Sequence, residues 1–376
     1  MSVKSLIVPP ISARILGEGR VLKARRKAEA ARLAAGAPHR VEFFHDPSDP
    51  YSHLLQSVLP EFEARYDVDL LTHIVSPPSD AAAPERERLR AYAREDAGRL
   101  AAKAGRDIDL DALAPATDTA AGDARLDHLG HYQGGMLHYA GEWYWGLDRL
   151  HHLEARLQDL GAGPQAAPLF APPTVPSGSG ETGAVLHWYL SFRSPYTAIV
   201  RDRVKVLADR YGAELRLRYV LPMVMRGLPV PRAKRRYIPL DTAREARRLG
   251  IPFGRVIDPV GKPVEMGYSL MPLAERRGRG YAYVQSWLSG VWAEGVDAGS
   301  RKGLRRIVER AGLDWTEAQG ALGSDDWRAI AEDNRADMME RGIWGVPSFR
   351  VGDTITWGQD RLWVVEDALK AMARNS

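Results

Sequence analysis

Two short stretches of the sequence place a hydroxyl or a carboxyl side chain directly before a proline and a tyrosine. They read Ser194-Pro195-Tyr196-Thr197 and Asp49-Pro50-Tyr51-Ser52, and each begins a segment with the apolar spacing of a helix. The first turn of a helix carries unpaired N–H groups and a partial positive charge, which stabilise an anion. Ser194 could donate a hydrogen bond to such an anion. In the alternative interpretation Ser194 only caps the helix.

The composition excludes several other kinds of chemistry. The 376 residues contain no cysteine, so this chain has no disulfide, no thiolate metal ligand and no cysteine nucleophile. Thiol–disulfide exchange needs a thiolate, which excludes redox catalysis of that type by this chain alone. Histidines gather in one stretch without the pattern of a known metal motif, and we expect no metal site there. They are His128, His131, His138, His151 and His152.

Positive charge is concentrated at the N-terminus. The first 40 residues hold nine Lys and Arg against two Glu, whereas the whole chain has a formal charge of only +4. The remainder is therefore net negative, which does not favour nucleic-acid binding. No apolar run reaches the roughly 20 residues of a membrane span, and we expect no membrane partner. We interpret the basic start as a helix over about residues 20–35, with an organelle transit peptide as the alternative.

The same order of elements is predicted twice along the chain. The first half reads as strand 41–45, a helix from Pro50, strand 68–75, a charged helix over 84–105, short strands at 136–139 and 142–145, and a helix from Asp148. The second half reads as strand 185–192, helix 195–211, strand 214–220, several helices, a hairpin over 348–357 and a final helix. A segment rich in Pro and Gly separates the halves.

Sequence matches between the halves indicate a duplication. VEFFHDPSDPYS (41–52) aligns with LHWYLSFRSPYT (186–197), and WGLDRL (145–150) aligns with WGQDRL (357–362). A strand–helix–strand unit gives a parallel pair with a right-handed crossover, and a hairpin adds antiparallel strands. The prediction is an α/β fold of two tandem thioredoxin-like (DsbA-like) domains, each a mixed sheet with a helical insertion.

This fold prediction divides the chain into four parts. We expect a basic N-terminal extension (1–40), a degenerate thioredoxin-like domain (41–162), a linker (163–183) and a DsbA-like domain (184–376). The last domain carries a helical insertion over about 222–344 and is the one that we expect to be active. We call residues 41–162 the first copy and residues 184–376 the second copy.

The second copy resembles the 2-hydroxychromene-2-carboxylate isomerase and kappa-class glutathione transferase branch of the DsbA-like superfamily. Four motifs in order carry the resemblance: SFRSPYT (191–197), PRAKRRYIPLDTAREARRLGIPF (231–253), GVPSFRVGD (345–353) and WGQDRL (357–362). They span about half of the chain. The resemblance implies glutathione as cosubstrate, while the first copy resembles the same family only weakly.

The resemblance also implies roles for individual residues. Ser194 would stabilise the thiolate of bound glutathione, which lowers the thiol pKa. Pro347 would follow a cis peptide bond that turns the Val346 backbone toward the peptide-like ligand. In this family the segment Gln359, Asp360 and Arg361 holds the γ-glutamyl end of glutathione. The alternatives are an ordinary loop proline and residues that merely cap the last helix.

Five side chains are assigned to a substrate pocket. They are Phe192, Tyr196, Lys234, Tyr237 and Trp344. Aromatic residues at such positions are alternatively parts of the core. Lys234 and Tyr237 share a helical face with Asp241 and Arg244, for which we favour ordinary i,i+3 and i,i+4 pairing on a solvated face.

The first copy departs from the family at two of these positions. Asp49 replaces the serine, and its carboxylate would repel a thiolate. Gly135 falls at the cis-proline position when residues are counted back from Trp145. We therefore expect the first copy to bind no glutathione and to pair with the second copy as a built-in pseudo-dimer. The alternative is a different ligand, with Asp49 as an acid or base.

The sequence thus predicts a cytoplasmic enzyme of aromatic compound catabolism. It would be a glutathione-dependent isomerase or glutathione transferase acting on a small aromatic or unsaturated acid. We expect either a monomeric pseudo-dimer or a homodimer, and no nucleic-acid partner. The alternative from another class is a non-catalytic thioredoxin-like scaffold that binds a peptide or a small-molecule ligand at the cis-proline groove.

Overall fold

The computed structural model describes residues 3–343 and 345–375. The chain forms two compact units, each of which is described by itself. The first unit consists of Val21–Pro173 and Pro229–Tyr237, and the second consists of Met1–Arg20, Thr174–Leu228 and Ile238–Ser376. Each unit contains one four-stranded sheet. Within the described residues, no helix combines the length and the hydropathy that a membrane-spanning segment requires.

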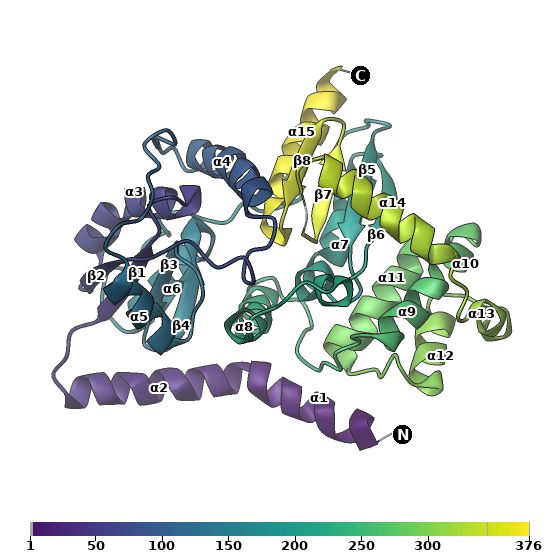
Figure 1. Cartoon of the computed structure of the whole chain (residues 1–376), viewed down its shortest axis with the longest axis horizontal. Helices are drawn as coiled ribbons and strands as arrows, with labels where there is room; N and C mark the ends of the chain where they lie inside the picture. Colours follow the sequence, from purple (N-terminus) through teal and green to yellow (C-terminus); the bar gives the residue numbers. More distant parts are fainter. Residues whose placement is uncertain (1–2, 344, 376) are drawn as a thin grey trace. The chain divides into compact units, whose positions relative to one another are not determined.

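The sheet of the first unit has the strand order β2-β1-β3-β4 (Figure 1). Its strands are β1 (Arg40–His45), β2 (Asp69–Ile74), β3 (Met136–Tyr139) and β4 (Glu142–Trp145). β1 is parallel to β2 and antiparallel to β3, which forms a hairpin with β4. The hairpin turns at Ala140 and Gly141, which both have positive φ. Every residue of β1 after Arg40 is buried, as expected for a strand in the middle of a sheet.

The first unit also contains α-helices. They are α2 (Glu18–Ala34), α3 (Pro50–Arg65), α4 (Arg86–Lys103), α5 (Ala120–Leu129) and α6 (Gly146–Asp159). α3 packs against β1 and α6, while α5 packs against β2. The basic helix predicted near the N-terminus is α2, whose Arg25 forms a bidentate ion pair with Glu142 at 2.7 and 2.9 Å.

The sheet of the second unit repeats the first, with the order β6-β5-β7-β8. Its strands are β5 (Val185–Leu190), β6 (Glu214–Tyr219), β7 (Ser348–Val351) and β8 (Thr354–Trp357). The strand directions are the same, and the pairing of Leu186 with Val351 corresponds to that of Val41 with Tyr139. The predicted α/β fold of two tandem mixed sheets is confirmed.

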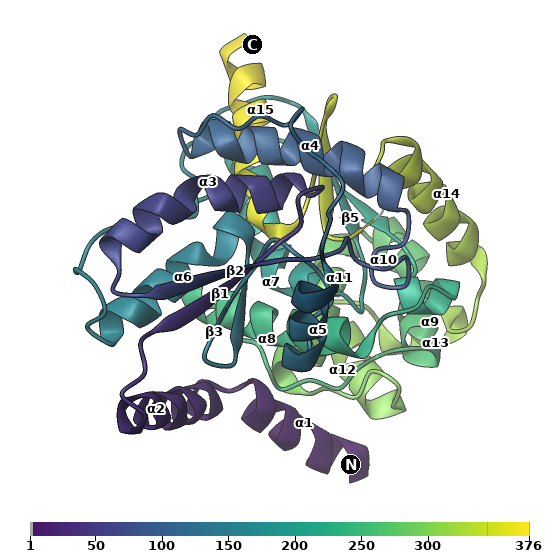
Figure 2. The same ribbon diagram turned by 60° about the vertical axis from the view of Figure 1, so that its left-hand side comes forward.

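The second unit contains a larger set of helices. They are α1 (Val3–Leu16), α7 (Pro195–Arg210), η1 (Met223–Arg226), α8 (Arg232–Arg248), α9 (Lys262–Ser269), α10 (Met271–Arg276), α11 (Gly280–Ser289), η2 (Gly290–Glu294), α12 (Arg301–Arg310), α13 (Trp315–Ala321), α14 (Asp326–Glu340), η3 (Gln359–Arg361) and α15 (Leu362–Asn375). The first residues of α8 belong to the first unit. Successive helices from α9 to α13 pack on one another as a helical group (Figure 2). This group lies between β6 and β7, within the segment 222–344 that we predicted as the insertion.

Candidate active site

Ser194 stands directly before α7, at the end of the loop that follows β5. Pro195 takes the first helical position, where its missing N–H costs nothing. The Ser194 Oγ accepts a hydrogen bond from the Thr197 N–H at 3.2 Å and donates one to the Val346 carbonyl at 3.3 Å. The second bond is long for a hydroxyl donor and therefore weak. Ser194 thus caps the helix and can also redirect its proton to an anion.

The loop before Ser194 is fixed by the helical insertion. The Phe192 N–H donates to the Tyr268 hydroxyl at 3.1 Å, and the Phe192 carbonyl accepts from the Trp292 indole at 3.2 Å. Arg193 forms a bidentate ion pair with Asp258, with both bonds at 2.8 Å. Sequence patterns missed these supports, because Tyr268, Trp292 and Asp258 lie in a segment without a recognisable motif. Their contacts fix Phe192 and Arg193, the two residues directly before Ser194.

The Phe192 side chain is part of the hydrophobic core. Its ring has no exposed surface, is stacked on Trp287 at a centroid distance of 4.6 Å and lies 4.7 Å from the ring of Tyr268. Phe192 therefore packs in the core instead of lining an open pocket, which corrects its assignment to the substrate pocket. The physical reason is the insertion, whose aromatic side chains close over the end of β5.

A cis peptide bond joins Val346 and Pro347, as the sequence predicted. The Pro347 carbonyl accepts a hydrogen bond from the Gly358 N–H at 2.9 Å, which ties this loop to the end of β8. The contact between Ser194 and the Val346 carbonyl brings the two predicted features together. A hydroxyl at a helix start and a cis-proline loop thus form one site.

The segment Gln359–Arg361 forms η3, next to the cis-proline loop. The Gln359 amide accepts a hydrogen bond from the Arg203 guanidinium and donates to Asp360, and it donates to Glu245 at 3.3 Å. Burial lowers the pKa of Arg203 to about 10, and the charge of Asp360 opposes this shift. Arg361 is buried, and its N–H donates to the Gly358 carbonyl at 3.1 Å. Sequence analysis missed Arg203, although it lies seven residues after Tyr196 and thus on the same face of α7.

Contacts within the second unit also fix the position of the Tyr196 side chain. Its hydroxyl donates to Asp241 at 2.8 Å, and Asp241 accepts a second bond from Arg244 at 2.6 Å. The predicted i,i+3 pair between Asp241 and Arg244 is therefore present, but Asp241 is buried and not on a solvated face. A buried ion pair of this kind holds the Tyr196 hydroxyl firmly.

The other predicted pocket residues are Lys234, Tyr237 and Trp344. Lys234 belongs to the first unit, where its ammonium donates to the Ala82 carbonyl at 2.8 Å and burial lowers its pKa to about 8. Tyr237 also belongs to the first unit, and its ring meets the ring of His131 edge-on at 5.2 Å. Trp344 lies outside the described residues. The roles of these three residues in a substrate pocket stay predictions.

In the first unit, Asp49 occupies the position that corresponds to Ser194, and its contacts differ. Asp49 precedes α3, and its carboxylate accepts from the N–H groups of Tyr51 at 3.3 Å and Ser52 at 3.2 Å. The Gly146 N–H donates to the Gly135 carbonyl at 2.9 Å, as Gly358 does to Pro347 at the same distance. Gly135 therefore occupies the cis-proline position, as counted from the sequence.

The Asp49 carboxyl group takes the space beside Gly135. A Cβ atom at Gly135 would lie only 2.9 Å from Asp49 Oδ2. Burial and the neighbouring charge of Asp46 raise the pKa of Asp49 to about 7. Asp49 therefore changes its charge near neutral pH, in contrast to the uncharged Ser194.

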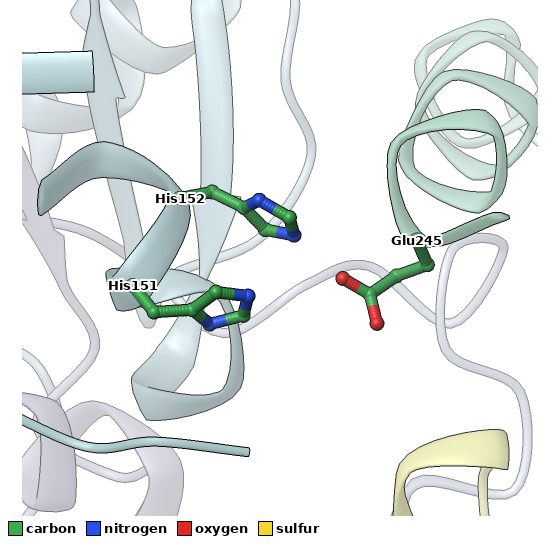
Figure 3. A group of neighbouring side chains, drawn as sticks. All are labelled: His151, His152 and Glu245. Atoms are coloured by element: carbon green, nitrogen blue, oxygen red, sulfur yellow. The ribbon is translucent and has the colours of Figure 1, made fainter. Parts of the chain in front are cut away.

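The histidines of the histidine-rich stretch have different surroundings. His138 lies 3.5 Å from a Glu42 oxygen, whereas the His131 ring is buried among aromatic rings and burial lowers its pKa to about 3. His151 and His152 are neighbours on α6 with ring centroids 4.0 Å apart (Figure 3). Glu245 of α8, also drawn in Figure 3, accepts from Arg248 at 2.7 Å within its own unit. His128 is exposed.

Comparison with known proteins gives the class of the second unit. Residues 185–370 match the DsbA-like thioredoxin domain family. This half of the chain is therefore a DsbA-like thioredoxin domain, and it contains no cysteine.

Its curated relatives share one name. The chain is 25% identical over 200 residues to the 2-hydroxychromene-2-carboxylate isomerase of Pseudomonas putida, covering 51% of this chain and 97% of that enzyme. It is 23% identical over 194 residues to the enzyme of the same name from Pseudomonas sp. (strain C18), covering 49% of this chain and 90% of the relative. A solved structure of 2-hydroxychromene-2-carboxylate isomerase matches with 24% identity and a TM-score of 0.44, over 51% of this chain and 97% of that one. The resemblance of the second copy to the DsbA-like family is confirmed by the family match, and its curated relatives are named as isomerases.

Proposed function

We propose that this protein is a glutathione-dependent isomerase, similar to 2-hydroxychromene-2-carboxylate isomerase, whose active part is the second unit. The observation that carries the proposal is the contact between the Ser194 hydroxyl and the carbonyl of Val346, directly before Pro347. In a chain without cysteine, this site offers a hydroxyl donor at the start of a helix. The curated relatives, which are named as isomerases, support enzymatic activity.

Ser194 would act on the thiol of glutathione. An ordinary thiol has a pKa of about 8.5, so only a small fraction is ionised at neutral pH. The partial positive charge at the start of α7 and a hydrogen bond from Ser194 both favour the thiolate. The long Ser194–Val346 bond of 3.3 Å is readily exchanged for a bond to sulfur. Each unit of lowered thiol pKa corresponds to about 1.4 kcal/mol of thiolate stabilisation.

The rest of glutathione would lie along the cis-proline loop and η3. The backbone N–H and C=O of Val346 suit the peptide groups of the cysteinyl residue. Asp360 suits the ammonium of the γ-glutamyl group, and Gln359 and Arg361 suit its carboxylate. Arg203, which already holds the Gln359 amide, supplies further positive charge at this end.

The reaction would need only positioning and thiolate formation. The glutathione thiolate adds to an unsaturated, ring-opened or chromene-like acid, a bond of the adduct rotates, and elimination returns the thiolate. A glutathione transferase uses the same first step and keeps the adduct. Within the second unit, Tyr196 remains the proposed contact for the small aromatic or unsaturated acid. We place this activity in the cytoplasm.

A direct assay tests the proposal. The purified chain is mixed with 2-hydroxychromene-2-carboxylate, and the absorbance change is followed with and without glutathione. We expect turnover that requires glutathione and is lost in Ser194→Ala, while the matched first-copy variant Asp49→Asn keeps it. Turnover without glutathione, or undiminished turnover in Ser194→Ala, would contradict the proposal. A stable glutathione adduct in the mass spectrum would identify a transferase.

A further inference from the structure

A surface cavity of about 500 Å³ lies at the opposite end of the second sheet from Ser194. Val185 at the start of β5 and Gly352 just after β7 border it, whereas Ser194 follows the end of β5. The complete lining is Thr182, Ala184, Val185, His187, Arg350, Gly352 and Met372. All of these residues belong to the second unit, and none of them is assigned to the candidate active site.

Two arginine side chains contact the His187 ring of this cavity. The Arg350 Nη2 lies 2.8 Å from His187 Nε2, and the Arg218 Nε lies 3.1 Å from His187 Nδ1. Burial and the neighbouring guanidinium groups lower the pKa of His187 to about 4, so the ring is neutral at neutral pH. A neutral imidazole has one acceptor nitrogen and one N–H, and a guanidinium has only donors. In either tautomer, one arginine therefore faces another donor.

No described carboxylate lies within ion-pair distance of the two guanidinium groups at His187, although the charges of Asp337 and Glu275 act on Arg350 and Arg218 from farther away. Among the residues that the structure describes, neither Arg218 nor Arg350 forms an ion pair, and Arg218 bonds otherwise to the neutral Asn334 amide at 3.1 Å. The buried Arg350 Nε has no hydrogen-bond partner. Asp337 accepts instead from Tyr189 and, at 2.8 Å, from Arg341. An oxygen anion at the cavity would satisfy donors that now face each other.

At the position that corresponds to His187, the first sheet has a carboxylate, that of Glu42. Glu42 pairs with His138 across the sheet, as His187 pairs with Arg350. The Glu42 carboxylate accepts two bonds from Arg125, at 2.7 and 2.8 Å, and one from His73 at 3.0 Å. The first copy therefore neutralises its cations internally. The second copy has a neutral imidazole at that position and so lacks the equivalent internal anion.

We propose that this cavity binds the carboxylate or phosphate group of a small organic anion. Its oxygens would bridge the Arg350 guanidinium and the N–H of the His187 ring, and its apolar body would pack on Val185 and Met372. Planar bidentate pairing with a guanidinium favours oxygen anions of this kind. The proposal does not depend on the proposed function, because the residues of the two sites differ.

Calorimetric titration of the full chain with benzoate and with inorganic phosphate tests this site. We expect millimolar or tighter binding of at least one probe, weakened by at least about tenfold in Arg350→Gln. His187→Glu should weaken binding to the same extent, because the new carboxylate would take the place of the ligand's anion. The unit should stay folded, because the first sheet has a glutamate, Glu42, at the equivalent position. Arg216→Gln is the matched control, because Arg216 lies on β6, pairs with Glu214 and does not line the cavity. It removes the same charge and should leave binding unchanged.

The outcomes separate this site from the candidate active site. Preference for benzoate over phosphate would support a carboxylate ligand with an apolar body, and the reverse would support a phosphate ligand. No binding of either probe to the wild-type chain would overturn the proposal. Binding that persists in Arg350→Gln but disappears in Ser194→Ala would also overturn it, because the probe would then occupy the active site.

Discussion

The two sheets share strand order and register, yet they differ in the side chains at equivalent points. Ser194 stands where the first copy has Asp49, and Pro347 stands where it has Gly135. The backbone bond to that loop is nevertheless 2.9 Å long in both copies. The strand geometry has therefore been retained while the chemistry at the helix start has changed. In the first copy this site holds a titratable acid, whereas in the second it holds a neutral donor.

The loops before these helix starts are also supported differently. In the first unit the support is local, because Ser52 Oγ accepts from the Asp46 N–H at 3.0 Å and bonds to the His45 ring at 2.8 Å. In the second unit the support comes from Tyr268 and Trp292 of the insertion. The loop before Ser194 therefore depends on residues far away in the sequence.

The largest effect is expected for Ser194→Ala. Loss of the hydroxyl removes a hydrogen bond to the developing thiolate, and we expect turnover to fall on the order of a hundredfold or more, with little change in glutathione affinity. Steady-state kinetics over a range of glutathione concentrations measures both quantities. The matched change in the first copy is Asp49→Ala, which should leave turnover within about twofold, since Asp49 contacts no reacting atom. Equal losses in the two variants would contradict the difference between the copies.

The next largest effect is a loss of stability in Glu42→Gln, which removes the ion pairs of Glu42. Burial opposes the ionisation of Glu42, but hydrogen bonds from Arg125 and His73 outweigh it and lower the pKa to about 2. Glu42→Gln leaves a cation without its partner and should cost about 3 kcal/mol in the free energy of unfolding. The stabilisation by Glu42 should be present above pH 4.5 and lost as the pH falls toward about 2. Urea unfolding at several pH values checks this, and a stable Glu42→Gln would refute it.

A smaller effect is expected for Tyr268→Phe. The Tyr268 hydroxyl accepts from the Phe192 N–H and donates to the Val220 carbonyl at 2.8 Å, and both groups are buried. Its removal should cost about 2 kcal/mol and loosen the loop that carries Ser194. Denaturation and turnover are measured together, and the first unit supplies the control in Tyr51→Phe, whose hydroxyl bonds to Asp96. Unchanged stability would show that the insertion does not support the loop.

The smallest effect is a pH-dependent gain in Asp49→Asn. The pKa of Asp49 is raised from 3.8 to about 7, so its ionisation costs stability in the folded protein. This cost is absent below about pH 4, grows as the pH rises to 7 and is complete above that. The variant keeps a good helix cap and should be more stable above pH 7 by about 1–2 kcal/mol. Thermal unfolding at pH 4 and pH 8 should show the gain only at pH 8, and an equal gain at both would be inconsistent with this pKa.

Much of the fold could be predicted because local patterns specify it. The hairpins at 136–145 and 348–357 have compact apolar strands around a turn, and the repeated WGxDRL motif fixed their register, including the position of Gly135. The packing of the insertion could not be predicted, because helical periodicity does not say which core a helix covers. Sequence patterns therefore assigned Phe192 to a pocket, whereas the structure places its side chain in the core. Periodicity likewise gave no sign that Lys234 and Tyr237 belong to the first unit, since α8 continues through the boundary.

The central claim is that Ser194 of the second unit activates glutathione, and one titration tests it most directly. Glutathione is added to the wild-type chain and to Ser194→Ala at neutral pH, and the heat of binding and the ultraviolet absorbance of the thiolate are recorded together. We predict heat with both proteins and a thiolate band with the wild type alone. No binding at millimolar glutathione, or a thiolate band that survives in Ser194→Ala, would contradict the claim.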